Sequence, residues 1–393
     1  MTMEWEKIKE SWEKRREELC RMADQIYDWA EVGLEETKSS ALLEDYLEQQ
    51  GFAVEKGVGT LPTAFRATWK QGEGGPRLGF LCEYDALEGM GHGCGHHLQG
   101  PSVIGAALAV RDRFAGKGVP FSLVIYGTPA EETIGGKTVM MEQGCFQDID
   151  IALMMHAAPT TCVDVKSMAN KSYTVEFHGV RAHAAMSPEQ GRSAFDAALL
   201  SFNAIEFLRE HVNEDTRMHY TVRDAGGPAN VVPDRTLAQY ELRSYDTGYL
   251  RSLEPRFLDI LKGACLMTGT THTITETHEF YAKIPCLTLN DLVMEQARAF
   301  GAPQLSEPRQ KTGSTDFGII LYHMPGTCIR VAFVPEGTPA HSEAYLKAGK
   351  TEAAHKAIGY GSQILAAACC SILEDPEKLT AMWEEFRKRK ASH

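Results

Sequence analysis

The sequence predicts an α/β fold: a mainly parallel sheet with helices on both faces, plus an inserted ferredoxin-like module of βαββαβ order. Two observations lead to this prediction. Apolar runs of strand length recur along the chain, and long segments with apolar residues at helical spacing separate several of them. Between about residues 171 and 281 the pattern changes: short segments in which apolar and polar residues alternate, as in strands, occur together with two helical patterns. We therefore expect a second domain set into the first.

The elements of the first domain follow from apolar spacing. Roughly the first thirty residues have the pattern of a helix, and a second helix is expected from Thr37 to Gln49, just before Gly51. A further helical pattern runs from Val103 to Phe114. Four apolar runs are expected to form the sheet: 78–82, 121–126, 149–155 and 328–334.

The inserted module is expected to occupy residues 171–283, between two parts of the first domain, 1–170 and 284–393. Its strands are expected over 173–178, 217–223, 237–243 and 272–280, and its helices over 193–211 and 249–267. The first of these helices carries more apolar side chains than one face of a small module needs: Phe195, Leu199, Leu200, Phe202, Ile205 and Phe207.

Composition limits the class of protein. The 393 residues favour two or three domains, and the formal net charge of −13 argues against nucleic acid as a partner. The charged N-terminal segment lacks the apolar region of a signal peptide, and the sequence contains no run of about 18 apolar residues typical of a membrane span. We therefore expect a cytoplasmic protein with no membrane partner, whose ten cysteines are reduced thiols or metal ligands.

Residues able to bind metal follow each of the four apolar runs. Ligands of an open α/β sheet bind outside the carboxyl ends of its strands, so these side chains are expected to meet at one rim. In chain order the candidates are Cys94 with His96, Glu131 with Glu132, His156, and His341. Taken singly, each has an ordinary explanation, such as a core histidine or a solvated pair of carboxylates. Together they favour a metal centre.

The residue types indicate which metals fit. Thiolate and imidazole suit zinc, and carboxylate with further imidazole also accepts manganese, cobalt or nickel. Five ligands exceed the four of a closed structural zinc site, so two ions with open positions are expected. Two ions roughly 3.5–4 Å apart can hold a water between them and lower its pKa to about 7. Because adjacent side chains project differently, one of Glu131 and Glu132 can bind metal while the other faces the water.

At these residues the chain resembles the dinuclear metallopeptidase family that includes aminoacylases, glutamate carboxypeptidases and auxin-conjugate amidohydrolases. The resemblance covers nearly the whole chain in the same order. Its motifs are Tyr84-Asp85-Ala86-Leu87, Gly91-His92-Gly93-Cys94-Gly95-His96, Pro129-Ala130-Glu131-Glu132, His156, Gly179-Val180-Arg181-Ala182-His183-Ala184-Ala185 and Pro339-Ala340-His341-Ser342. Asn230-Val231-Val232-Pro233 and Gly313-Ser314-Thr315-Asp316 are most similar to the branch of p-aminobenzoyl-glutamate hydrolases and β-alanyl or Xaa-Arg dipeptidases.

The resemblance implies a role for each site residue. Two divalent ions, zinc foremost, would be held by five ligands, which are Cys94, His96, Glu132, His156 and His341. Glu131 would be the general base. The inserted module would be a lid and dimerisation domain, whose His183 approaches the metals, often from the partner subunit, and helps to polarise the scissile carbonyl. Asn230 and Arg243 would contact the substrate carboxylate.

Two residues depart from the family's pattern. His97 stands where Asp or Asn usually follows the Cys-Gly-His motif, and Glu88 stands where Pro usually follows Asp-Ala-Leu. His97 is expected to support a ligand or to be an extra one, which leaves the metal and the preferred substrate open.

The expected function is hydrolysis of the amide bond of a small N-acyl amino acid or dipeptide by a homodimer. A metal-bound hydroxide would attack the carbonyl, and Glu131 would pass the water's proton to the leaving amine. One alternative is a hydrolase with Cys94 as nucleophile, which leaves Glu131, Glu132 and both later histidines unexplained. The other is a metal-binding scaffold without catalysis, against which the retained Glu131 argues.

Overall fold

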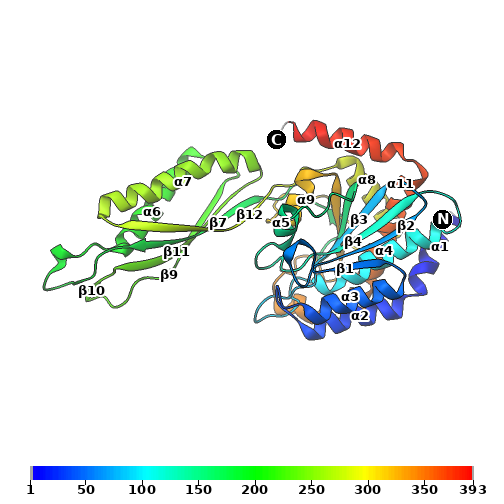
Figure 1. Cartoon of the computed structure of the whole chain (residues 1–393), viewed down its shortest axis with the longest axis horizontal. Helices are drawn as coiled ribbons and strands as arrows, with labels where there is room; N and C mark the ends of the chain where they lie inside the picture. The colour runs from blue at the N-terminus through cyan, green and yellow to red at the C-terminus, as the bar shows by residue number, and fades with distance from the viewer. Residues whose placement is uncertain (1–2, 392–393) are drawn as a thin grey trace. The chain divides into compact units, whose positions relative to one another are not determined.

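A computed structural model describes residues 3–391 of the chain. The chain divides into two compact units (Figure 1). The first unit runs up to Lys166 and resumes at Lys283, and the second unit is Ser167–Ala282.

The first unit is built on one mixed sheet. Its strand order, within the described residues, is β1-β2-β4-β3-β5-β13-β6. The bounds are β1 (Ala53–Lys56), β2 (Phe65–Gln71), β3 (Arg77–Cys82), β4 (Phe121–Gly127), β5 (Ile151–Ala158), β6 (Cys162–Val163) and β13 (Gly326–Ala332). The central strands β4, β3, β5 and β13 are parallel to one another, and each outer strand pairs antiparallel with its inner neighbour. Every residue of β4 is buried, and because successive side chains point to opposite faces, both faces of the sheet are covered. The expected mainly parallel sheet is confirmed.

The helices of the first unit largely follow the predictions. The N-terminal segment forms two helices, α1 (Met3–Glu13) and α2 (Arg16–Trp29), instead of one. The break is held by Arg15, which is buried and pairs with Asp112 at 2.7 Å. The other helices are α3 (Thr37–Gln49), α4 (Gln99–Phe114), α5 (Gly136–Glu142), α8 (Leu287–Ala299), α9 (Phe317–His323), α10 (Glu343–Lys347), α11 (Glu352–Glu374) and α12 (Glu377–Lys390).

Helix α11 is apolar and long enough to cross a membrane by length and hydropathy alone. It packs against α4 and the central strands, and most of its apolar window is buried inside the unit. This is the environment of a core helix.

Two predicted strands are displaced along the sequence. The run 149–155 forms β5 two residues later, so that His156 lies within the strand and not after it. The run 328–334 forms β13 two residues earlier. The reason is pairing: Asp150 is engaged by Arg77 before β5 begins, and β13 takes the register of β5 from Gly326 onward.

The second unit has the predicted βαββαβ order. It consists of β7 (Ala169–His178), α6 (Ala194–Leu208), β9 (Arg217–Asp224), β11 (Arg235–Ser244), α7 (Thr247–Thr268) and β12 (Thr271–Phe280). The four strands form an antiparallel sheet in the order β12-β7-β11-β9, and both helices pack on each other and on its central strands. This is the ferredoxin-like arrangement. Two short strands, β8 (Ala182–His183) and β10 (Val231–Val232), form a separate ladder.

Candidate metal centre

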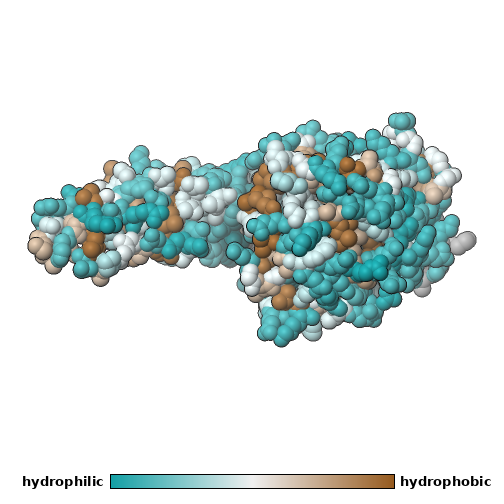
Figure 2. Space-filling view, turned by 60° about the horizontal axis from the view of Figure 1, so that its bottom comes forward, coloured by the Kyte–Doolittle hydropathy of each residue, from teal (hydrophilic) through white to brown (hydrophobic). Residues whose placement is uncertain are grey.

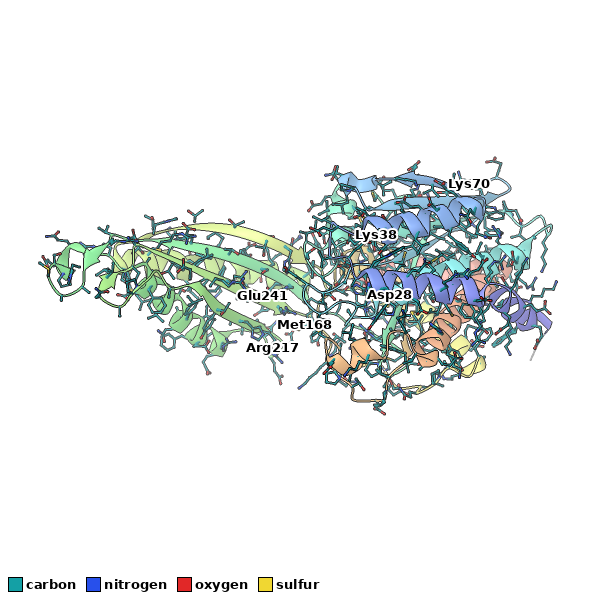
Figure 3. All side chains as sticks on the ribbon, turned by 90° about the horizontal axis from the view of Figure 1, so that it is seen from below. Asp28, Lys38, Lys70, Met168, Arg217 and Glu241 are labelled. Carbon is teal, nitrogen blue, oxygen red and sulfur yellow. The ribbon has the colours of Figure 1, made fainter. Side chains whose placement is uncertain are left out.

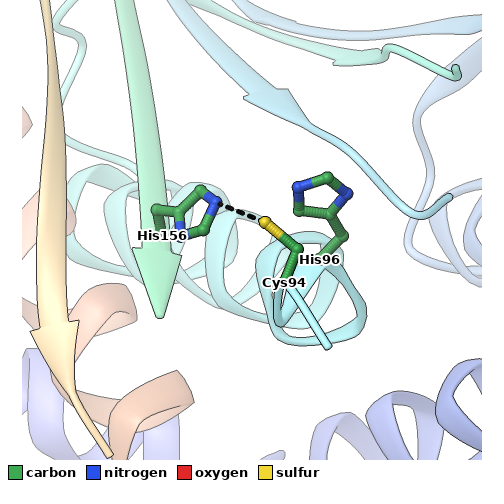
Figure 4. Close-up of side chains that lie close together, drawn as sticks. All are labelled: Cys94, His96 and His156. Atoms are coloured by element: carbon green, nitrogen blue, oxygen red, sulfur yellow. Dashed lines mark hydrogen bonds between the residues drawn. The ribbon is translucent and has the colours of Figure 1, made fainter. Parts of the chain in front are cut away.

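A glycine shapes the turn that presents Cys94 and His96. Gly95 has a φ of 88°, in the left-handed region that favours glycine, and a Cβ at this position would come within 3.0 Å of the Ala157 Cβ. The turn places Cys94 Sγ 3.7 Å from Nε2 of His156, which projects from β5 (Figure 4). A thiol from one loop and an imidazole from a central strand therefore meet at the same rim of the sheet.

In two imidazoles Nδ1 bonds to a protein oxygen, while Nε2 faces another candidate ligand, Cys94 for His156 and Glu132 for His96. His96 Nδ1 donates to the Asp85 carboxylate at 3.0 Å, and His156 Nδ1 donates to the Ala157 carbonyl at 2.7 Å. Since each Nδ1 carries the hydrogen, each Nε2 keeps a lone pair, and such outer partners are typical of metal-binding histidines. His96 Nε2 and Glu132 Oε1 are buried and have no hydrogen-bond partner among residues 3–391. Buried polar atoms of this kind require a partner, and a cation fits their chemistry.

The five predicted ligands fall into two groups that share Cys94. One group is Cys94, His96 and His156, and the other is Cys94, Glu132 and His341; within each, the ligand atoms lie within 4.8 Å of one another. Glu132 Oε1 lies 3.6 Å from His341 Nε2 and 4.0 Å from His96 Nε2. The donor set fits two divalent ions, although the role of each residue stays a prediction.

Glu131 lies beside a buried ionic network. Its carboxylate, with those of Glu83 and Asp316, forms a group whose oxygens lie within 4.8 Å of one another. The fully buried Lys137 ammonium donates to Glu83 at 2.5 Å and to Asp316 at 2.7 Å. Burial, followed by the charges of Glu83 and Asp316, raises the pKa of Glu131 well above its usual range. A raised pKa is what a carboxylate needs to act as a base near neutral pH.

The network residues were not among the predicted site residues. Glu83 and Asp85 directly follow β3, and Asp316 belongs to the Gly-Ser-Thr-Asp motif. Their positions in the sequence could therefore have identified these three as site residues. Lys137 lies on the short helix α5, and nothing in the sequence indicates that it is buried, because lysine side chains are usually exposed to solvent.

Predicted residues of the second unit lie in two places. His183 and Asn230 come together, since β8 pairs with β10 and the Ala184 N–H donates to the Asn230 carbonyl at 3.0 Å. His183 Nδ1 accepts from the Ala185 and Met186 N–H groups, both at 3.2 Å. Its Nε2 therefore carries the hydrogen and is exposed as a donor.

Arg243 lies at the other end of the module's sheet. It stands near the end of β11, opposite Asn170 near the start of β7, and pairs with Glu241 at 3.4 Å. Figure 3 marks this end by Met168, where the chain has just entered the unit, and by Glu241. The ten residues of β11 separate the two ends by about 30 Å.

The sequence matches the family described as peptidase family M20/M25/M40 over residues 79–367, which is more than half of the chain. The chain belongs to this family. The expected family and its metallo-hydrolase class are thereby confirmed.

Several relatives of this M20 chain are similar over most of their length. The Xaa-Arg dipeptidases of Mus musculus and Homo sapiens are 32% identical, and each alignment covers 94% of this chain and 89% of the relative. A p-aminobenzoyl-glutamate hydrolase chain of Escherichia coli (strain K12) is 30% identical, with 97% of this chain and 94% of the relative covered.

The YxeP protein of Bacillus subtilis, a dinuclear metal binding peptidase from the M20 family, shares the fold. Its structure matches this M20 chain with a TM-score of 0.69 at 18% identity, covering 92% of this chain and 99% of that one.

The Cys94 nucleophile alternative fits this M20 chain poorly. Burial raises the pKa of the Cys94 thiol to about 12, while burial, with Arg330 and His96, lowers the pKa of His156 to about 3. The His156 imidazole is thus a weak base, and the Cys94 thiol is hard to deprotonate. A metal ion must displace the thiol proton, so metal affinity should rise with pH.

His97 does not extend the ligand set. Its Nε2 donates to the Gly349 carbonyl at 2.9 Å, and its ring packs edge-on against Tyr27. Among the described residues it belongs to neither ligand group. The expectation of an extra ligand is therefore not supported, because His97 faces the segment before α11.

Glu36 holds the loop that carries the two adjacent glutamates. Its Oε1 accepts the Ala130 N–H at 2.8 Å, its Oε2 accepts the Thr63 hydroxyl at 2.9 Å, and the side chain is fully buried. Ala130 has a φ of 61°, which is costly for a residue with a Cβ, so this bond fixes a strained turn just before Glu131. Burial raises the pKa of Glu36 to about 7.

This pKa predicts a pH dependence of stability. Between the ordinary value of 4.5 and about 7, the folded state keeps a proton that the unfolded state releases, so stability falls as the pH rises through this window. Glu36→Gln keeps an acceptor for Ala130 without the charge. From pH 5 to 8, we expect Glu36→Gln to gain at most about 3 kcal/mol relative to wild type. Thermal melts of the metal-free proteins at both pH values measure this, and parallel pH profiles would contradict it.

Proposed function

We propose that the chain hydrolyses the amide bond of a small N-acyl amino acid or dipeptide. In this proposal Cys94, His96, Glu132, His156 and His341 hold two divalent ions, zinc foremost, and Glu131 is the general base. The observation that carries the proposal is that all five donors converge with Glu131 beside them. The printed names of the relatives, a dipeptidase and an aminobenzoyl-glutamate hydrolase, support this substrate class.

The chain's own residues divide the work of hydrolysis. The two ions, when bound, would supply an activated water and positive charge near the scissile carbonyl. Glu131 accepts the proton of the water and delivers it to the leaving amine, as its raised pKa favours. Asp85 orients His96 through Nδ1 and accepts the Glu132 N–H at 2.9 Å, so one carboxylate sets the position of two ligands.

The lid histidine is proposed to act on the substrate carbonyl. His183 Nε2–H is an exposed donor with its tautomer fixed by two backbone N–H groups, which suits an oxygen that gains negative charge. Asn230 lies beside it and is proposed as a substrate contact. Arg243 is proposed to contact the substrate carboxylate, but it lies about 30 Å away along β11, more than a small dipeptide can span. We therefore propose that His183 and Arg243 reach one active site from two copies of the chain.

Exposed apolar side chains support association through the lid. On α6 and α7, large apolar residues stand exposed, and Figure 2 shows apolar side chains among hydrophilic ones on the second unit. They are Leu199, Phe207, Leu258, Leu266 and Met267. We propose that a homodimer forms through this surface.

The experiment that tests the function measures metal and turnover together. The purified protein is expected to hold up to two transition-metal ions per chain and to release amino acid from N-benzoyl amino acids or dipeptides. Metal analysis by mass spectrometry and a ninhydrin assay for released amine provide the two readouts. Metal without turnover would favour the scaffold alternative, and turnover without metal would favour the Cys94 nucleophile.

A further inference from the structure

A cluster of basic side chains surrounds one buried carboxylate in the first unit. Asp164 directly follows the edge strand β6. Its Oδ2 accepts from Arg330 Nε at 2.6 Å, and Arg309 binds both oxygens, with Nε 2.9 Å from Oδ1 and Nη2 2.5 Å from Oδ2. Lys283 Nζ donates to the backbone carbonyl of Asp164 at 3.4 Å. Two guanidinium groups thus bind one carboxylate, and a lysine ammonium binds the backbone of the same residue, in a chain whose formal net charge is −13.

The register of the sheet places this cluster next to the candidate metal centre. Arg330 on β13 pairs with His156 on β5, and residues in register on neighbouring strands project to the same face of a sheet. Tyr345 Oη donates to the Ala157 carbonyl, which also accepts the bond from His156 Nδ1. Burial raises the pKa of Tyr345, and both Arg330 and Arg309 oppose the rise, as cations near its hydroxyl do.

The two arginines retain donors that the protein does not use. Over residues 3–391, Asp164 is the one hydrogen-bond partner of both guanidinium groups. The side chains are 40% exposed for Arg309 and 22% exposed for Arg330, so neither is closed off from solvent. The loop of Arg309 is anchored, because the Thr161 N–H donates to the Gln304 carbonyl at 2.8 Å. The donors are therefore held in place in the absence of a ligand.

We propose that Arg309 and Arg330 form a subsite for a free carboxylate of the substrate. This rests on the proposed function and narrows it to N-acyl amino acids or dipeptides whose carboxylate is not blocked. Guanidinium groups present their N–H donors in a fork that matches a carboxylate, and Asp164 offsets only part of the cluster's positive charge. The carboxylate is either that of an acidic side chain, as in an N-acyl-glutamate, or the α-carboxylate, which Arg309 and Arg330 would then bind together with the proposed contact from Arg243.

The test compares substrates that differ only in one carboxylate. These are N-benzoyl-glutamate, N-benzoyl-glutamine, which lacks the side-chain carboxylate, and N-benzoyl-isoglutamine, which lacks the α-carboxylate. For substrates with the recognised carboxylate, Arg309→Met should raise KM about tenfold or more, because a hydrogen bond to a charged group is lost, and should leave kcat within about twofold. For the analogue that lacks this carboxylate, KM should not change. The analogue with the unchanged KM therefore shows whether the subsite binds the α-carboxylate or the side-chain carboxylate.

Arg77→Met is the matched control. Arg77 is also a half-exposed arginine that binds one aspartate, Asp150, through Nε and Nη2, but at the start of β3, away from the candidate metal centre. Its KM values should equal those of wild type for all three substrates. An equal KM change in all three for Arg309→Met, or no change, would overturn the subsite.

A binding measurement separates this proposal from the proposed function. Calorimetric titration of the metal-free proteins with N-benzoyl-glutamate should show about tenfold or more weaker binding for Arg309→Met than for wild type and Arg77→Met. If the metal-loaded wild type hydrolyses none of the three compounds, the proposed function fails for this substrate class, and the titration alone decides the subsite. Equal affinities in all three proteins would overturn it.

Discussion

Replacing Glu131 by glutamine is expected to lower turnover by about 10²–10⁴, which corresponds to roughly 3–5 kcal/mol in the activation barrier. The glutamine amide fills the volume of the carboxylate but cannot accept the proton of the water. Glu131 is not among the five proposed ligands, so its variant should keep both ions. KM should change little, because the contacts that bind the substrate are left in place.

Glu132→Gln is the matched comparison, since it makes the same change one residue along the chain. Glu132 Oε1 is buried without a hydrogen-bond partner in the described part of the chain and faces two imidazoles. Its variant should lose affinity for at least one ion together with activity. The two proteins are compared by metal content and turnover at several metal concentrations. Metal loss in Glu131→Gln with retention in Glu132→Gln would reverse the roles, and normal turnover in both would refute the mechanism.

Mixing two inactive variants is expected to restore activity if the lid histidine works in the partner's site. Glu131→Gln removes the proposed base from one protomer, and His183→Ala removes the proposed lid donor from the other. In a mixed dimer, one site carries both changes and the other carries neither. With free exchange of protomers and equal amounts, about half of the dimers are mixed, so activity should recover to about a quarter of wild type.

The recovery is measured after incubating the two purified proteins together, with each protein alone as a control. The increase should follow the rate at which protomers exchange. Native mass spectrometry shows whether mixed dimers have formed. If they have, and the mixture is no more active than the two proteins measured separately, His183 acts within its own chain. A fully active monomer would exclude the dimer proposal altogether.

The sequence predicted the fold well because burial leaves a periodic trace. The buried run Phe121–Gly127 and the alternating Arg235–Ser244 each indicate a strand, and the order of elements then fixes the two units. The residues at the rim of the sheet could be predicted equally well, since the carboxyl ends of parallel strands lie at the same edge of a sheet. What hydropathy could not fix was register. His156 lies inside β5 because pairing with β3 and β13 sets the strand, not the apolar run.

The missed residues are those whose partners are distant in sequence. Lys137 is buried only because Glu83 and Asp316 approach it from other elements, 54 and 179 residues away. Arg330 interrupts an apolar run and gave no sign that Asp164 and Arg309 surround it. Charged side chains have no periodic signature in the core, so only the three-dimensional structure reveals them.

The bond between Glu36 and the Ala130 N–H has a consequence for the limits of the functional module. The match to the family description begins at residue 79, yet the turn before Glu131 is held by Glu36, which in turn is held by Thr63, and both residues lie before the match. Glu36 and Thr63 therefore belong to the scaffold of the candidate site although they lie outside this match. A fragment trimmed to residues 79–367 would keep every proposed ligand and lose the hydrogen bond that holds the turn before Glu131, the proposed base.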